Sequence, residues 1–221
     1  MAIAFDAVNS GASGTGATLT RTHTCTGSDL TLWVSAVCNL ANSITGCTYN
    51  GVAMTQIGTG LVDGAGNTNH LFYLINPATG TNNVVLSQSG SNSINFISDS
   101  YTGCGQVTQP DSSNTNSTGS NSSLTTSTTV IASNCWLIES GAAGTGCASV
   151  NTSQSLRGQQ NAGSGGSRVT NGIVDSNATV GTGSQSLDFN TDGNGNHPLT
   201  VIIASIAPVI INTNSNFLAV F

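Results

Sequence analysis

The sequence predicts an all-β protein, an antiparallel β-sandwich of jelly-roll type with about ten or more strands. Three features support this fold class. Apolar and polar residues alternate with a period of two along most segments, clusters of Gly, Asn and Asp separate those segments, and hardly any segment has the period of about 3.6 residues that marks a helix.

The clearest strand pattern lies between residues 30 and 38. Leu32, Val34 and Ala36 alternate there with Trp33 and Ser35, which predicts a strand with one buried face and one mixed face. The other runs that predict strands are, in chain order, 17–24, 52–58, 70–75, 83–87, 94–101, 124–132, 135–140, 185–190 and 199–206.

The connections between these runs are of two kinds. The pair Asn50-Gly51, between Tyr49 and Val52, predicts a type I′ hairpin turn, because Asn and Gly tolerate the positive φ angles of that turn. Segments 110–123 and 151–167 are rich in small polar residues and have no periodicity. They predict two long surface loops that are free to make contacts.

A short internal similarity links the two halves of the chain. Residues 28–35 and 133–140 share the frame Ser, Asp or Asn, two residues, Leu, two residues, Ser. A duplication would place two equivalent strands in the two halves of a sandwich, while a chance match is the alternative at this length.

The length of 221 residues favours a single β-sandwich domain, which we place at 1–208. Residues 209–221 then form an apolar tail, whose large side chains would each cost about 1.5–3 kcal/mol to leave in water. This tail is either the last strand of its own sheet or an arm that adds to the sheet edge of a neighbouring subunit. Its candidate assembly residues are Ile210, Ile211, Phe217, Leu218, Val220 and Phe221.

Charged residues are few, since the chain has three basic residues, none of them lysine, and nine acidic ones, for a net charge of −6. Nucleic acids and anionic membrane surfaces require clustered basic residues, so we exclude both as partners. No apolar run is long enough for a transmembrane helix, and the first residues lack the pattern of a signal peptide. We therefore expect a protein that is made and used without export by the general secretory route.

The reactive residues of the sequence form no recognisable catalytic or redox motif. The six cysteines contain no C-x-x-C pair, which favours buried thiols over a zinc or redox site, with late disulfides as an alternative. His23 and Cys25 share one face of a predicted strand, but a nucleophile pair needs a third group. We expect a protein that is not an enzyme; a cleft joining His23 to two Asp carboxylates would reverse this expectation.

The best candidate for a metal site begins at Asp188. Asp188, Asn190 and Asp192, followed by Gly193, match positions 1, 3, 5 and 6 of a calcium-binding loop, whose oxygen ligands surround a sharp turn. Position 12 is Leu199 instead of the expected bidentate Glu, so a plain hairpin loop is the competing interpretation. Calcium is the one cofactor that the sequence suggests.

Four sequence blocks carry a resemblance to a known group of proteins. They are HTCTGS at 23–28, TYNGVAMT at 48–55, LINPATG at 74–80 and ASIAP at 204–208. Over residues 1–208 the chain resembles a mostly uncharacterised family of phage and metagenomic β-sandwich proteins of virion type. The resemblance implies a structural, self-associating component of the virion exterior, such as a capsid decoration, tail or fibre protein. Its implied partners are further copies of the chain and other virion proteins such as the major capsid protein.

Two other functions fit the same composition. Trp33, Trp136, Tyr49, Tyr73 and Tyr101 could stack on sugar rings, which would make the protein a carbohydrate-binding, lectin-like module with a glycan ligand. A subunit of an extracellular filament or surface layer is the second alternative, and it predicts helical self-assembly of the purified chain.

Overall fold

The computed structural model describes residues 1–11, 13–39, 43–191 and 195–210. These residues form antiparallel β-sheets joined by turns, with one 3₁₀ turn, η1 (Gly165–Ser167), and no α-helix among them. The predicted all-β sandwich fold is therefore confirmed. The described residues contain no helix that could cross a membrane.

The first half of the chain forms a larger and a smaller sheet. The larger sheet has the order β1-β11-β4-β9, and the smaller one has the order β3-β10-β5-β6. Pairing is nested, because β1 pairs with β11, β3 with β10, β4 with β9 and β5 with β6. The bounds are β1 Ala4–Ser10, β2 Gly14–Thr15, β3 Thr18–Cys25, β4 Thr31–Cys38, β5 Ile44–Tyr49, β6 Val52–Ala53, β7 Thr55–Gln56, β8 Leu61–Val62, β9 Thr68–Ile75, β10 Gly80–Gln88 and β11 Ser93–Thr102. The short strands β2, β7 and β8 extend the larger sheet.

The second half repeats this arrangement. Its larger sheet has the order β12-β19-β14-β17-β16 and its smaller sheet the order β13-β18-β15, with the same nested pairing of β12 with β19, β13 with β18 and β14 with β17. The bounds are β12 Ser112–Asn121, β13 Ser123–Val130, β14 Trp136–Ala143, β15 Val150–Asn151, β16 Ser155–Ala162, β17 Val169–Asp175, β18 Gly183–Thr191 and β19 His197–Ile206.

The internal similarity found in the sequence corresponds to this structural repeat. Ser35 and Ser140 occupy equivalent positions in β4 and β14, 105 residues apart, and β10 and β18 have the same alternation of buried and exposed residues. The repeat is larger than we expected, because each copy is a sandwich of two sheets instead of one half of a single sandwich. The domain boundaries at 1–208 and 209–221 stay predictions.

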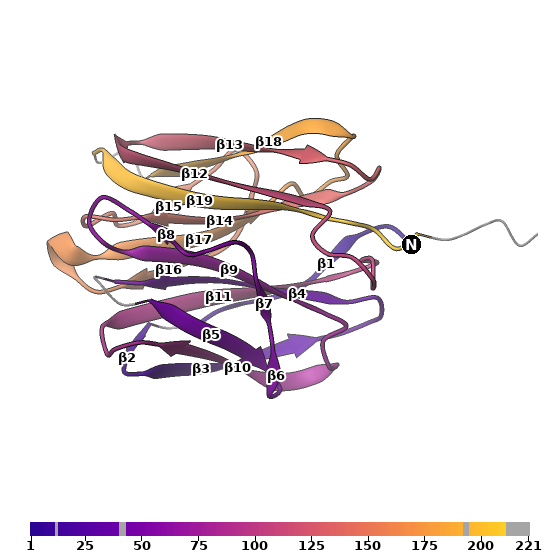
Figure 1. The fold of residues 1–221 in the computed structure, drawn as a ribbon, viewed down its shortest axis with the longest axis horizontal. Coiled ribbons are helices and arrows are strands. Elements are labelled where there is room, and N and C mark those ends of the chain that lie inside the picture. The colour runs from indigo at the N-terminus through magenta and orange to yellow at the C-terminus, as the bar shows by residue number, and fades with distance from the viewer. Residues whose placement is uncertain (12, 40–42, 192–194, 211–221) are drawn as a thin grey trace, which may run out of the picture.

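The two sandwiches stack through their larger sheets, so that the molecule has four layers (Figure 1). One apolar cluster joins the facing surfaces of the larger sheets, with Trp33, Leu71 and Ile97 from the first half and Trp136 and Ile202 from the second. We call this contact the seam. It explains why β4 and β14 are buried along their whole length, since each has an apolar cluster on both faces.

A buried hydrogen-bond network with approximate two-fold symmetry crosses the seam. The hydroxyls of Ser35 and Ser140 are 2.6 Å apart. Ser35 donates to Oδ1 of Asn171 and Ser140 donates to Oδ1 of Asn69, both at 2.7 Å. In return, each Asn amide donates at 3.0 Å to the backbone carbonyl of that same serine, Asn171 to Ser35 and Asn69 to Ser140. These reciprocal bonds fix how the two halves sit against each other, because unpaired buried polar groups would be costly.

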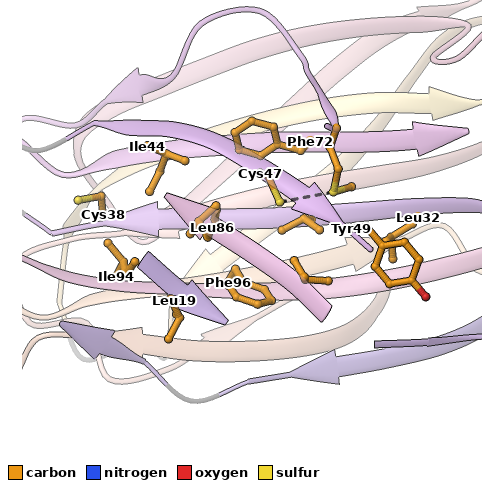
Figure 2. Close-up of a cluster of buried hydrophobic side chains, with 14 of the residues drawn as sticks. Leu19, Leu32, Cys38, Ile44, Cys47, Tyr49, Phe72, Leu86, Ile94 and Phe96 are labelled. Atoms are coloured by element: carbon orange, nitrogen blue, oxygen red, sulfur yellow. Dashed lines mark hydrogen bonds between the residues drawn. The ribbon is translucent and has the colours of Figure 1, made fainter. Parts of the chain in front are cut away.

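The interior of the first sandwich is one continuous apolar cluster (Figure 2). Leu86 and Tyr49 from the smaller sheet pack there against Phe72 and Phe96 from the larger one. The interior of the second sandwich is divided into two clusters, one around Phe189 and one around Leu187.

The predicted connections had mixed outcomes. The Asn50-Gly51 turn is confirmed, with φ angles of 49° and 78° and pairing of Tyr49 with Val52. The two predicted loops are wrong in most of their length, because they contain β12 and β16. Both strands lie at sheet edges and are mostly not fully buried, so they need no period of apolar residues.

Candidate functional site

Strand β12 is a free edge of the larger sheet in the second half. Among the described residues it pairs only with β19, and eight of its ten residues are exposed. Every side chain in it belongs to Ser, Thr, Asn or Gly. Its equivalent in the first half, β1, is also an edge strand, but it lies against β16, whose Gln160 side-chain amide donates to the Ser10 carbonyl at 2.9 Å. The two halves therefore differ, because β1 is partly buried against the other half and β12 is mostly exposed.

Side chains of β12 also reach the neighbouring edge strand β13. The amides of Asn114 and Asn116 donate to the backbone carbonyls of Ser127 and Thr125, at 2.8 and 3.2 Å. Two backbone carbonyls at the edge of β13 are thus already bonded to side chains of β12. The open sheet edge considered below is therefore that of β12.

An apolar groove lies where the chain enters β12 and leaves β19. It has a volume of about 300 Å³. Three large apolar side chains at the groove or next to it are strongly exposed, Val107 at 93%, Ile131 at 72% and Ile210 at 83%. The residues that line the groove are Gly105, Gln106, Val107, Thr108, Asp111, Ala132, Ala207, Pro208, Val209 and Ile210.

Hydrogen bonds hold the groove walls in place. The buried Gln109 amide donates to the carbonyls of Gly105 and Ala207, at 3.1 and 2.8 Å, and its own carbonyl accepts from the Ala207 amide at 3.0 Å. The Val209 amide donates to the Gly103 carbonyl at 2.9 Å. The groove is consequently part of the folded structure up to the residues that lead into the C-terminal tail.

Asp111 shapes the groove by closing the turn that follows β13. Its carboxylate accepts from the amides of Ile131 and Ala132, at 2.7 and 3.1 Å, and from the Ser205 hydroxyl at 3.2 Å. In the first half Asp6 has the same role, since it accepts from the amide of Thr26 at 2.9 Å and from the Ser100 hydroxyl at 2.6 Å.

The predicted assembly residues begin at this groove. Ile210 is exposed and lines it. Ile211, Phe217, Leu218, Val220 and Phe221 lie outside the described residues. Their role in assembly stays a prediction, and no sequence pattern indicates the groove into which Ile210 leads.

The candidate calcium ligands are only partly described. Asp188 and Asn190 lie in the extended strand β18, and Asp188 accepts from the hydroxyls of Thr125 and Ser153 at 2.8 and 3.2 Å. Asp192 lies outside the described residues. Among those residues, no group of three or more His, Cys, Asp or Glu side chains is arranged to hold a metal. The calcium site stays a prediction.

His23 and Cys25 do share a buried face, as expected, but the surrounding groups are hydroxyls. Nδ1 and Nε2 of His23 lie 2.9 Å from the hydroxyls of Ser98 and Ser100, and burial lowers the pKa of His23 to about 4. Ser100 in turn donates to Asp6. All these groups except Asp6 are buried, and one Asp carboxylate, not two, is linked to the histidine within the described part of the chain.

A second histidine lies next to a cavity. His70 is buried, neither ring nitrogen has a hydrogen-bond partner within the described residues, and burial lowers its pKa to about 4. Its ring stacks on Phe72, with ring centroids 6.0 Å apart. Gly60 is packed against the imidazole so closely that a Cβ there would lie 2.3 Å from Cε1. The adjoining cavity of about 500 Å³ is lined mainly by hydroxyl and glycine residues.

The seam contains a buried charge cluster that sequence reasoning missed. Arg157 makes a two-point ion pair with Asp175, at 2.6 and 3.0 Å, and its guanidinium lies 4.1 Å from the Phe5 ring centroid. The Tyr101 hydroxyl donates to Asp175 at 2.8 Å. Burial and the neighbouring Asp175 charge raise the pKa of Asp99 well above its usual range. The partners come from both halves, so the cluster ties the seam together.

The cysteines and aromatic side chains lie inside the protein. All six cysteines are buried thiols, as the motif reasoning favoured. Trp33, Trp136, Tyr49 and Tyr101 are buried, and Tyr73 is partly buried at the seam. Within the described residues, no aromatic ring is among the large apolar side chains exposed on the surface.

Comparisons of the chain with protein-family models, with curated proteins and with solved structures found no match.

Proposed function

We propose that this protein is a structural, self-associating component of a virion, most specifically a capsid decoration protein or another exterior protein of a tail or fibre. We further propose that each half is a jelly roll. The nested pairing supports this, because the first long strand of each half pairs with the last, the second with the next to last and the third with the following one.

The observation that carries the proposal is the open edge of β12 beside the apolar groove. An exposed sheet edge offers unpaired backbone N–H and C=O groups, which natural proteins normally cover or block with charge. The ten residues of β12 contain neither charge nor proline. An edge with no such protection is suited to pairing with another chain.

The surface chemistry supports contact between copies. Charged residues make up 5% of the chain, so copies can approach without strong repulsion or the desolvation of many ions. Short Ser, Thr and Asn side chains also lose less rotamer freedom on contact than Lys or Glu would. Both effects lower the cost of forming a symmetric assembly, and they apply equally to contacts with other virion proteins such as a major capsid protein.

The glycan-binding alternative has less support. A lectin groove built on ring stacking needs exposed aromatic side chains, and the five Trp and Tyr residues are buried or partly buried. A filament or surface-layer subunit shares the self-association and differs in symmetry, because an open contact propagates while a closed one stops.

The test is the mass of the purified chain in solution, measured by light scattering over a range of concentrations and followed by electron microscopy. A discrete ring or closed oligomer would support the virion role. Open helical filaments would favour the filament subunit. A monomer at all concentrations would contradict self-association. Shortening the chain after Ile210, which leaves the groove intact, reports whether the tail is required.

A further inference from the structure

We propose that the apolar groove is the receptor for the Phe217–Phe221 segment of a second copy of this chain. The inference rests on the proposed self-association and deepens it, because it names the surface that receives the C-terminal arm. Arm and groove would then belong to different copies in every contact.

The apolar character of the groove is not required by the fold. Ala132, which lines the groove, and its neighbour Ile131 follow β13, and the equivalent residues in the first half, 105 positions earlier, are Gly27 and Thr26. The same hydrogen bond closes the turn in both places, since Asp111 accepts from the Ile131 amide as Asp6 accepts from the Thr26 amide. One half thus has a threonine at this position and the other has an isoleucine that is 72% exposed. An exposed apolar side chain that the fold does not need points to a contact outside the fold.

The C-terminal arm has the chemistry of the missing occupant. After the groove residue Ile210 and Ile211, the sequence continues with five polar residues, 212–216, and then with Phe-Leu-Ala-Val-Phe. Among the described residues that line the groove, Asp111 alone is charged, and its carboxylate already accepts three hydrogen bonds. A volume of about 300 Å³ accommodates one or two large side chains as anchors. The phenylalanines and leucine of this segment are the neutral, apolar anchors that such a groove favours.

The position of the open edge favours a second copy over the chain's own arm. Asp111 lines the groove and directly precedes Ser112, the first residue of β12. An extended segment that pairs with β12 therefore reaches the groove at the end of that strand. The chain's own arm starts inside the groove at Ile210 and would have to reverse within six residues, a span of at most about 20 Å, to return there. An arm arriving from a neighbour needs no reversal.

The test uses Ile131→Thr, which introduces the residue found at the equivalent position of the first half, and a chain shortened after Ile210. Val62→Thr is the matched control, because Val62 is also exposed, at 62%, but is not next to a residue that lines the groove, as Ile131 is next to Ala132. Unfolding midpoints should agree among the three full-length chains, because Thr26 occupies the equivalent position and its amide donates to Asp6 as the Ile131 amide donates to Asp111. We expect Ile131→Thr to weaken association at least tenfold in light scattering and Val62→Thr to leave it unchanged.

Complementation between damaged copies identifies the occupant. The Ile131→Thr chain keeps an intact arm, and the shortened chain keeps an intact groove. A mixture of the two should form a mixed complex that neither forms alone, and a fluorescent peptide of residues 212–221 should bind the shortened chain. If the shortened chain dissociates while Ile131→Thr associates normally, the groove assignment is wrong and self-association stands.

Two further outcomes would contradict the inference. The first also contradicts the proposed function, and the second contradicts the choice of a second copy as the occupant. A full-length chain that stays monomeric, with no peptide binding to the shortened form, contradicts both the proposed function and the groove. A monomeric full-length chain whose shortened form binds the peptide places the arm in its own groove, which contradicts the second copy.

Discussion

Replacing Glu139 by valine should stabilise this protein, and more strongly as the pH rises. Glu139 lies on β14 and faces the interior of the second sandwich, on the same side of the strand as Leu137 and Ala143, which belong to the two separate apolar clusters there. It is fully buried, and neither carboxylate oxygen has a hydrogen-bond partner among the described residues. The equivalent residue in the first half, 105 positions earlier, is Val34 in a continuous core.

The size of the change at low pH follows from two opposing effects. Removing an unpaired buried carboxyl group recovers about 1–3 kcal/mol of desolvation free energy. Valine is smaller than glutamate, and the space left behind costs about 0.5–1.5 kcal/mol. We therefore expect Glu139→Val to change the free energy of unfolding by about 0–2 kcal/mol near pH 4.

Ionisation of Glu139 in the unfolded chain makes the gain larger at higher pH. Burial, helped by the negative charge of Asp188, raises the pKa of Glu139 well above its usual range. The folded protein then keeps a proton that the unfolded chain loses above about pH 4.3, so the wild type loses stability as the pH rises toward the folded-state pKa. Each pH unit in this window is worth about 1.4 kcal/mol. The gain from Glu139→Val should reach about 2–4 kcal/mol at pH 6.

The assay is guanidinium unfolding from pH 4 to 8, followed by the fluorescence of Trp33 and Trp136, which are both buried at the seam. Glu139→Gln is the control, because it keeps a buried polar group but cannot ionise. It should therefore show the pH-dependent part of the stability gain without the part that comes from removing a buried polar group. Other titrating groups, such as His23 and His70, cancel in the difference between variants. A gain that does not change between pH 4 and pH 6, or a loss of stability at pH 6, would show that Glu139 is not held protonated by burial.

Three more predictions concern packing, the seam and the thiols. Gly141→Ala should lower the free energy of unfolding in guanidinium by about 1–3 kcal/mol, because its Cβ would lie 2.2 Å from the Phe189 ring. Adding Phe189→Leu should restore stability, since the first half has Ala36 and Leu86 at the equivalent positions. Failure of this rescue would contradict the equivalence of the halves. Asn171→Leu should lower the free energy of unfolding by about 2–4 kcal/mol in the same assay, because it leaves buried polar groups of Ser35 and Asn95 without their partner across the seam. A loss below about 0.5 kcal/mol would show that the network does not stabilise the seam. The six cysteines should resist maleimide labelling at pH 8 until the protein unfolds, because all six are buried. Burial also raises the pKa of the thiols of Cys38, Cys47, Cys104 and Cys135 to about 11–12. Rapid labelling of the native protein would contradict their burial.

The candidate site could be predicted only in part. The apolar residues of the tail, at 210–211 and 217–221, could be recognised in the sequence, because large apolar side chains are costly to leave in water. The groove was not visible, since Val107, Ile131 and Ile210 are far apart in the chain and each looks like an ordinary exposed residue. The charge cluster at the seam was hidden for the same reason, because Asp175 meets Tyr101 only when the two halves stack.

Local features of the fold follow from the sequence alone. A period of two predicts a strand with one buried face, and Asn50-Gly51 predicts its turn from the φ angles that these residues tolerate, because both signals depend only on neighbouring residues. The pairing of strands and the number of sandwiches depend on tertiary structure, since partners such as β1 and β11 are distant in the chain. Residues 112–121 and 155–162 form the strands β12 and β16 because their partners β19 and β17 supply backbone hydrogen bonds. Backbone hydrogen bonds can form with almost any side chain, so they leave no pattern in the sequence. Whether β4 has a second buried face likewise depends on the other half of the molecule, against which its polar Ser35 is packed.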